Sequence, residues 1–220
     1  MQKPSFSQRI LSLLQSFWLG LQSLWLRLFS RQSISNYGST FTFLKNLVND
    51  PKSVGAVLPS SKWLAKAMVS HVKISPGGMI VELGAGTGVI TQALLKSGVS
   101  PKKIIAIESA KNLAKDLQAK LPDIQVIDGD AANLNDLLSA SNVRIDTVIS
   151  SLPLRSLPEK TVQSVLSQIP LVLSDKGHFI QFTYDLRNDV DYYPENYHLQ
   201  HSRIVWWNIP PAKVEVFSIR

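Results

Sequence analysis

The chain has 220 residues, of which 45% are hydrophobic, and this predicts a globular protein with one full domain and room for an appendage. It contains no cysteine, which excludes disulfides and thiolate metal sites, and its four histidines lack a metal-ligand spacing, so we expect no bound metal. The formal net charge of +7 favours an anionic partner, such as a nucleic acid, an anionic membrane or an acidic substrate.

Residues 1–36 are predicted to form an N-terminal amphipathic helix. No charged residue stands between Ile10 and Leu26, and no acidic residue precedes Asp50. At helical spacing the serines and glutamines gather near one side, whereas the leucines, Trp18 and Trp25 gather on the other. Tryptophan prefers the membrane interface and arginine suits anionic headgroups, so we predict that this helix lies in the surface of a phospholipid membrane, preferably an anionic one.

Three other interpretations of this segment stay open. A signal peptide lacks a clear cleavage site here, and a membrane-spanning helix would need a run less diluted by polar residues. A helix packed on the domain or within a dimer fits the same amphipathic pattern.

Residues 37–220 alternate short apolar runs with amphipathic stretches. Strands are predicted at 79–83, 103–108, 124–128, 145–150 and 178–184, and helices at 88–97, 110–120, 133–140 and 160–173. This alternation indicates a parallel sheet with helices on both faces. Two further runs, 203–208 and 213–219, have no helix between them and predict a terminal antiparallel pair. We therefore expect an α/β fold: a Rossmann-like, doubly wound sheet with a C-terminal antiparallel hairpin.

The stretch "VELGAGTG" (81–88) lies where the first strand becomes a helix, and it contains Gly84, Gly86 and Gly88. Glycines allow the backbone to turn sharply and a ligand to approach closely. Ligands of such sheets bind at the carboxyl ends of the strands. The spacing differs from the dinucleotide fingerprint, and the Lys-Ser/Thr of a phosphate-binding loop is missing, so a nucleoside without phosphates is favoured.

Acidic residues follow the same strand ends. Glu108 ends the next strand, roughly 20 residues after the glycine turn, where it could accept hydrogen bonds from ribose hydroxyls or simply cap a helix in solvent. Asp130, in "DGDA", could accept the adenine amino group or cap the helix that follows. Glu82, beside the turn, could orient the ligand through water or backbone.

"VELGAGTG", "AIES" and "DGDA" resemble, in order and spacing, the first three motifs of the class I S-adenosylmethionine-dependent methyltransferases. The resemblance covers roughly residues 53–220 and implies S-adenosylmethionine as the cofactor. It also implies a cofactor site made of Glu82, Gly84, Ala85, Gly86, Glu108, Ser109, Gly129, Asp130 and Ala131.

"ISSLPLRSLP" (149–158) follows the fourth strand, whose end faces the transferred methyl group in this superfamily. Proline fixes the backbone, so Pro153 could hold nearby carbonyls toward a substrate and form a rigid lip over the reaction centre. We expect Ser151, Leu152, Pro153 and Tyr184 at the catalytic position. Enzymes that methylate adenine carry N/D-P-P-Y or N-L-P-Y here, and because this chain lacks both the Asn and the aromatic residue, the motif argues against a nucleic-acid partner.

A closer resemblance is to the bacterial phospholipid N-methyltransferases of the soluble type, through "SVGAVLPSSKWLAKAM" (53–68), "SSLPLRSLP" (150–158) and "WNIPPAKV" (207–214). It implies methylation of the amine of phosphatidylethanolamine, towards phosphatidylcholine, by a cytoplasmic protein peripheral on the inner face of the membrane. Arg155 and Arg187 are candidates for the lipid phosphate, or are solvated surface residues. An enzyme like the rRNA adenine N6-methyltransferases, and a membrane adaptor without enzymatic activity, are the alternatives.

Overall fold

The structure is a computed structural model, and it describes residues 61–141, 143–187 and 192–220. The predicted N-terminal helix (1–36) and the first part of the predicted domain (37–60) lie outside the described residues. Within the described ranges, none of the helices has the length and the apolar composition needed to cross a membrane.

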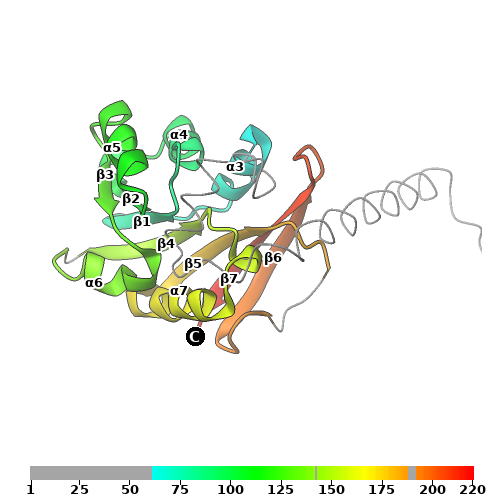
Figure 1. Cartoon of the computed structure of the whole chain (residues 1–220). Helices are drawn as coiled ribbons and strands as arrows, with labels where there is room; N and C mark the ends of the chain where they lie inside the picture. Colours follow the sequence, from blue (N-terminus) through cyan, green and yellow to red (C-terminus); the bar gives the residue numbers. More distant parts are fainter. Residues whose placement is uncertain (1–60, 142, 188–191) are drawn as a thin grey trace, which may run out of the picture.

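The described residues form one seven-stranded sheet with the order β3-β2-β1-β4-β5-β7-β6 (Figure 1). Its strands are β1 (Gly78–Leu83), β2 (Ile104–Glu108), β3 (Gln125–Asp128), β4 (Arg144–Ser150), β5 (Leu173–Thr183), β6 (Tyr197–Val205) and β7 (Ala212–Ile219). The first five strands run parallel, and β7 runs antiparallel to both β5 and β6. The strand order reverses between β1 and β4, which is where ligands bind in open α/β sheets.

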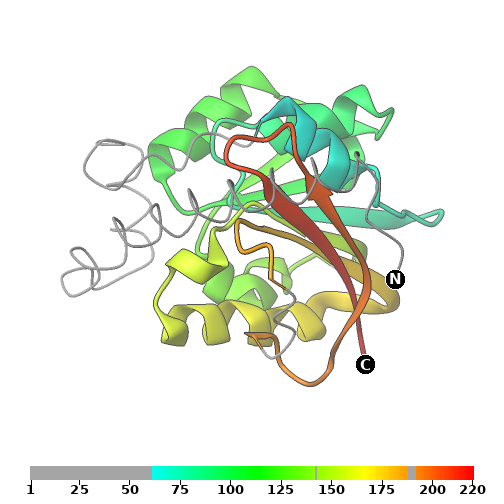
Figure 2. The same ribbon diagram turned by 90° about the vertical axis from the view of Figure 1, so that its right-hand side faces the viewer.

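The helices cover both faces of the sheet, as Figures 1 and 2 show. On one face lie α3 (Lys62–Val69), α4 (Val89–Lys96) and α5 (Lys111–Lys120); on the other lie α6 (Leu134–Leu138) and α7 (Glu159–Val172). Three short 3₁₀ turns complete the described elements: η2 (Pro101–Lys103), η3 (Ala131–Asn133) and η4 (Leu154–Ser156). The predicted doubly wound sheet with its terminal antiparallel hairpin is confirmed.

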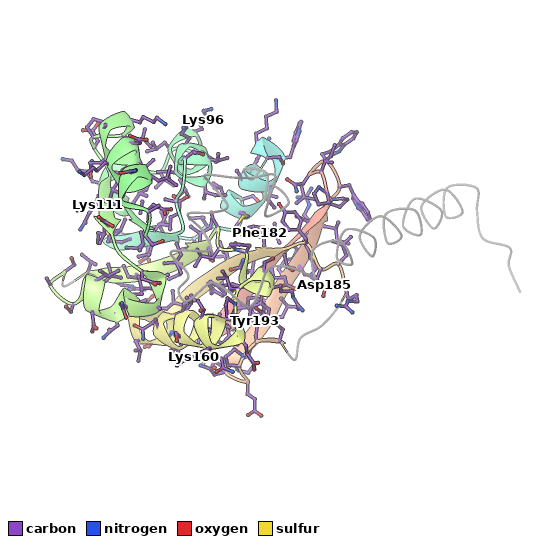
Figure 3. All side chains as sticks on the ribbon, viewed as in Figure 1. Lys96, Lys111, Lys160, Phe182, Asp185 and Tyr193 are labelled. Atoms are coloured by element: carbon purple, nitrogen blue, oxygen red, sulfur yellow. The ribbon has the colours of Figure 1, made fainter. Side chains whose placement is uncertain are left out.

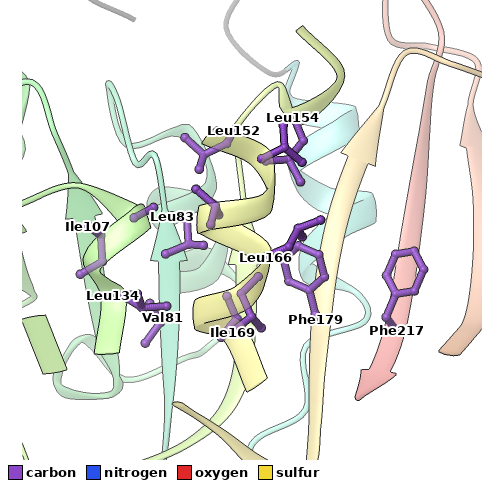
Figure 4. Packing of buried hydrophobic residues seen from close by; sticks show 14 of the residues in the cluster. Val81, Leu83, Ile107, Leu134, Leu152, Leu154, Leu166, Ile169, Phe179 and Phe217 are labelled. Atoms are coloured by element: carbon purple, nitrogen blue, oxygen red, sulfur yellow. The ribbon is translucent and has the colours of Figure 1, made fainter. Parts of the chain in front are cut away.

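Each inner strand contributes to two hydrophobic cores, because successive side chains point to opposite faces. On β1, Ile80 packs with the α3–α5 side, whereas Val81 and Leu83 pack with the α6–α7 side (Figure 4). On β5, Phe179 packs on the α6–α7 side and Ile180 packs on the α3–α5 side. Burial on both faces explains why these strands are nearly continuous apolar runs in the sequence.

Three elements differ from the sequence prediction. The strand predicted at 178–184 is β5, which begins earlier, at Leu173. The strand predicted at 203–208 is instead β6, which begins at Tyr197 and ends at Val205, so Trp206 and Asn208 lie in the turn before β7. As the edge strand, β6 exposes most of its polar side chains and has only a weak apolar signal. No helix was predicted at α3, where Ser61 accepts a hydrogen bond from the Leu64 N–H as an N-cap.

Candidate active site

The glycine turn after β1 depends on a close approach at Gly84. Its φ is +70°, and a side chain there would place Cβ 2.6 Å from Cδ2 of Leu152. The N–H of Gly84 donates to the carbonyl oxygen of Ile107 at 2.9 Å, which fixes the turn to β2. Only glycine satisfies both the left-handed φ and the contact with Leu152.

Glu108, at the end of β2, holds the second part of the turn. Its Oε2 accepts a 2.7 Å hydrogen bond from the N–H of Gly86, and its Oε1 accepts one of 2.8 Å from the N–H of Ala110. Gly86 has a φ of +54°, and a Cβ there would make only an ordinary contact, 3.9 Å from the carbonyl oxygen of Gly84. A carboxylate offers about four acceptor positions, so two remain on Glu108 for hydroxyl groups of a ligand.

A small hollow lies beside the turn, across the carboxyl ends of β1, β2, β3 and β4. Its lining is Gly84, Ile107, Ser109, Gly129, Asp130, Ala131 and Leu152. Asp130 Oδ1 accepts a 2.9 Å hydrogen bond from the Ala132 N–H, so this carboxylate does cap the turn that follows β3. The apolar lining and the polar rim match the chemistry of a purine base, whose faces are apolar and whose edge makes hydrogen bonds.

The lip after β4 is tied to the sheet by its backbone. The N–H of Ser151 donates to Leu83 O at 2.8 Å, and Leu152 lies beyond the carboxyl end of β1 (Figure 4). The carbonyl oxygen of Leu152 accepts from the side-chain amide of Gln181 at 2.8 Å and from the Leu154 N–H at 2.9 Å. Because a carbonyl oxygen has two lone pairs, this one is fully used inside the protein rather than presented to a substrate.

Two buried acceptor atoms beside the lip have no hydrogen-bond partner among the described residues: Ser151 Oγ and Gln181 Oε1. Gln181 is 1% exposed, and its Nε2 donates to the carbonyl oxygens of Leu152 and Phe182. These two carbonyls fix the amide with its nitrogen toward them and leave Oε1 as the open acceptor. Buried acceptors without a donor indicate a site for a bound water or for a ligand with N–H or O–H groups.

The comparisons with known proteins agree with this geometry. Residues 80–177 match the methyltransferase domain family. The fold is similar to magnesium protoporphyrin IX methyltransferase from Synechocystis PCC 6803, solved with bound S-adenosylmethionine, with a TM-score of 0.61 and 11% identity over 85% of this chain and all of that chain. Together, the match over residues 80–177 and the fold support a methyltransferase domain with S-adenosylmethionine as its cofactor.

Two curated relatives point to different substrates. The ornithine lipid N-methyltransferase of Singulisphaera acidiphila is 29% identical over 147 residues, which are 65% of this chain and 77% of the relative. The ribosomal RNA small subunit methyltransferase A of Thermotoga maritima is 32% identical over 106 residues, which are 46% of this chain but only 35% of the relative.

Of the residues predicted to bind the cofactor, four do not line the hollow: Glu82, Ala85, Gly86 and Glu108. Gly86 and Glu108 are joined by the hydrogen bond that holds the turn, whereas Glu82 and Ala85 pack elsewhere. Glu82 is fully buried, and its Oε2 accepts a 2.6 Å hydrogen bond from the Thr91 hydroxyl on α4. Burial raises its pKa to about 8, against the opposing effect of the Thr91 hydrogen bonds, so the carboxyl is largely protonated at neutral pH. Ala85 packs in the core on the α3–α5 side. Glu82 and Ala85 therefore contribute to the packing around the glycine turn and not to the lining of the hollow.

The lip residues Ser151, Leu152 and Pro153 lie together, but Tyr184 packs on the other side of β5. Its ring meets Phe182 edge to face, with centroids 5.5 Å apart, and it belongs to the core on the α3–α5 side. Burial raises the pKa of Tyr184, which its hydrogen bond with Asn208 partly opposes. Nothing in this arrangement brings the Tyr184 ring to the lip, so its catalytic role stays a prediction.

The arginines predicted for a lipid phosphate both pair with Asp185, just beyond β5 (Figure 3). Arg187 donates to both carboxylate oxygens, at 2.9 and 2.7 Å, and Arg155 lies 3.3 Å from Oδ2. Arg155 also stacks over the ring of Tyr192 at 4.2 Å. Two arginine cations around one carboxylate give this cluster a net positive charge, which suits a phosphate.

Gln181 is the residue that motif reasoning missed. The strand register sets it opposite Glu215, whose carboxylate pairs with Lys213 Nζ at 2.8 Å and accepts from the Tyr193 hydroxyl at 2.9 Å. The signal was present in the sequence: "HFIQFTY" places one amide inside an otherwise apolar strand.

Within the described ranges, no group of three or more possible metal-ligating side chains occurs.

Proposed function

We propose that this protein methylates the amine of a phospholipid headgroup at the membrane surface, converting phosphatidylethanolamine towards phosphatidylcholine. The observation that carries the proposal is the similarity to the ornithine lipid N-methyltransferase, which extends over 77% of that relative. In this proposal the protein acts as a peripheral protein on the cytoplasmic face of an anionic membrane, held there by the predicted N-terminal helix.

The cofactor half of the site has the side-chain chemistry that a nucleoside requires. S-adenosylmethionine supplies an electrophilic methyl group when bound. Glu108 would accept hydrogen bonds from the ribose hydroxyls, and Asp130, on the rim of the hollow, would accept from the edge of the adenine. The left-handed turn at Gly86 leaves its outer side open for the rest of the ligand.

In this proposal, the substrate amine binds at the lip. An amine that attacks a sulfonium carbon must point its lone pair at that carbon, and this requires its N–H groups to be held from the other sides. Ser151 Oγ, just after β4, and Gln181 Oε1, on the neighbouring strand β5, are buried acceptors, and they fit this task.

The ammonium group must lose a proton before attack, because its protonated form has no lone pair. The phosphate of the lipid could take this proton, as could a nearby base, and Glu215 is the carboxylate that the register sets beside Gln181.

Methylation of adenine in RNA is the second candidate, favoured by the 32% identity with the ribosomal RNA methyltransferase. The sequence of the lip argues against adenine methylation. Ser151 replaces the Asn or Asp of the adenine-specific motif, and Leu154 replaces its aromatic residue. Without an aromatic side chain the lip has no stacking platform for a flipped base.

The experiment that separates these candidates offers both acceptors at once. The full-length protein is incubated with methyl-labelled S-adenosylmethionine, anionic vesicles containing phosphatidylethanolamine, and small-subunit rRNA. The proposal predicts that the label enters the organic extract and comigrates with methylated phosphatidylethanolamine. Label in precipitated RNA, with none in the lipid, would assign the second function instead. A parallel reaction with ornithine lipid tests whether the acceptor is another amine-bearing lipid.

A further inference from the structure

Large hydrophobic side chains gather at one exposed corner of the molecule. Trp63 on α3 is 49% exposed, and in the turn between β6 and β7 Trp206 is 38%, Trp207 80% and Ile209 69% exposed. We call these four residues the tryptophan corner. Single exposed apolar residues are ordinary, but four together, three of them tryptophans, form a patch of the kind that marks an interaction surface.

The corner is held in shape by one buried side chain, Asn208. Its Nδ2 donates to Pro210 O at 2.6 Å, its Oδ1 accepts from the Ser61 N–H at 3.3 Å, and its own N–H donates to Val205 O at 3.2 Å. Asn208 therefore closes the hairpin turn and ties it to the start of α3. The residues on either side of it, Trp207 and Ile209, are left facing solvent.

The surroundings of the corner are basic. Two surface hollows border Trp63, one toward β6 and one toward α4, and their charged lining residues are Lys62, Lys66, Lys96 and Arg203. No acidic residue lines either hollow. Exposed tryptophans beside lysine and arginine suit the interface of an anionic bilayer, where the rings enter the headgroup region and the cations meet lipid phosphates.

The corner also lies at the same edge of the sheet as the active site. Thr183, which ends the parallel strand β5, pairs with Lys213 at the start of β7, and the turn projects beyond that point. Figure 1 shows this turn next to α3, beyond the carboxyl end of β5. A membrane held by this turn would therefore lie on the side of the molecule where a lipid headgroup must enter.

We propose that the tryptophan corner is a membrane-docking surface for anionic phospholipid bilayers, with Trp207 and Ile209 entering the interface. The four residues of the corner all lie outside the sequence of the predicted N-terminal helix (1–36). It does not need the proposed methylation of a lipid amine to be correct, since it rests on the exposed side chains and charges of the corner.

The test compares the full-length protein with a Trp207→Ser/Ile209→Ser variant in sedimentation with phosphatidylglycerol-containing vesicles. Both side chains are exposed, so the fold should persist, and an unchanged melting temperature checks this. Loss of their burial in the interface should weaken partitioning about tenfold or more. Leu171→Ser, at a 63% exposed position on α7, is the matched control and should partition as the wild type does. Equal partitioning of all three proteins overturns the proposal.

A second measurement separates the corner from the N-terminal helix. In a variant that keeps Trp207 and replaces the other tryptophans by phenylalanine, brominated lipids should quench the fluorescence. Absence of quenching in vesicle-bound protein overturns the proposal. A dimer that disappears in the double variant, without a change in vesicle binding, would assign the corner to a protein contact. Quenching in a protein that methylates no lipid would support the docking surface and reject the proposed function.

Discussion

The carboxylate of Glu108 shapes the glycine turn by accepting hydrogen bonds from the N–H groups of Gly86 and Ala110. In the proposed function it also binds the cofactor. We expect Glu108→Ala to weaken S-adenosylmethionine binding about ten- to hundredfold, because hydrogen bonds to a charged acceptor contribute roughly 1.5–3 kcal/mol. Glu108→Gln keeps one acceptor oxygen and should lose less. Calorimetry measures the dissociation constants, and Asp116→Ala, a charge removal on the exposed face of α5, is the control. An unchanged affinity in Glu108→Ala would contradict the assignment.

Glu82 gives a prediction about pH and stability. Its pKa is raised to about 8 in the folded protein by burial, against about 4.3 in an unfolded chain, so the folded state binds more protons between these values. The free energy of unfolding should therefore fall as pH rises from about 4.3 to about 8, by up to about 1.4 kcal/mol per pH unit.

Glu82→Gln removes the titration and keeps an acceptor for the Thr91 hydroxyl. Urea unfolding of both proteins at pH 5 and pH 8 measures the difference, which isolates Glu82 from other groups that titrate in this range. We expect the variant to gain stability relative to wild type as pH rises. A constant difference across this range would mean that Glu82 is ionised in the folded protein.

At the scale of elements, the lip is a short rigid link between β4 and α7. Pro153 is buried, precedes η4 and accepts a 2.8 Å hydrogen bond from Ser156 N–H. Its fixed φ limits the backbone next to Leu152, whose side chain contacts the glycine turn and whose carbonyl holds Gln181. In the proposed function, the lip thus joins the cofactor half of the site to the amine half.

Pro153→Ala should leave cofactor affinity close to wild type and lower turnover, since a small misplacement at the reacting centre can cost about a hundredfold. The measurement is the rate at saturating cofactor, normalised to folded protein. Pro158→Ala, which alters the second proline of the stretch at the start of α7, is the control and should affect stability more than turnover. A normal rate with a lowered melting temperature in Pro153→Ala would make this proline a strand terminator only.

The elements could be predicted from the sequence wherever burial was two-sided. Most inner strands and the helices between them lie within a few residues of their predicted bounds, because their apolar runs reflect packing on both faces. The exception is β5, whose more polar first part, from Leu173 to Gly177, was not predicted as strand. The edge strand β6 was misplaced, since it packs on one neighbour and carries mostly polar residues. The sequence prediction used apolar character alone and therefore placed Trp206 and Trp207 in the strand. Both residues instead lie exposed in the turn before β7.

At the scale of the whole molecule, local motifs predicted the glycine turn and both acids but not Gln181. The turn and the acids follow their strands directly, so their meeting at one edge follows from parallel strand direction. Gln181 becomes meaningful only when β5 is placed beside β4 and its amide meets the carbonyl of Leu152. The strand alternation also explains why Tyr184, three residues after Gln181, packs on the opposite side of β5.

The central claim is that a lipid amine receives the methyl group at this lip. The most direct measurement incubates the full-length protein with S-adenosylmethionine carrying a trideuteromethyl group. The vesicles contain equal amounts of phosphatidylethanolamine and its N-acylated analogue, and tandem mass spectrometry locates the label. The account predicts label on the headgroup nitrogen of phosphatidylethanolamine only. It also predicts a roughly tenfold lower rate in Ser151→Ala but not in Ser156→Ala, because only Ser151 supplies the buried acceptor. Label on both lipids alike, or none on the nitrogen, would contradict the account.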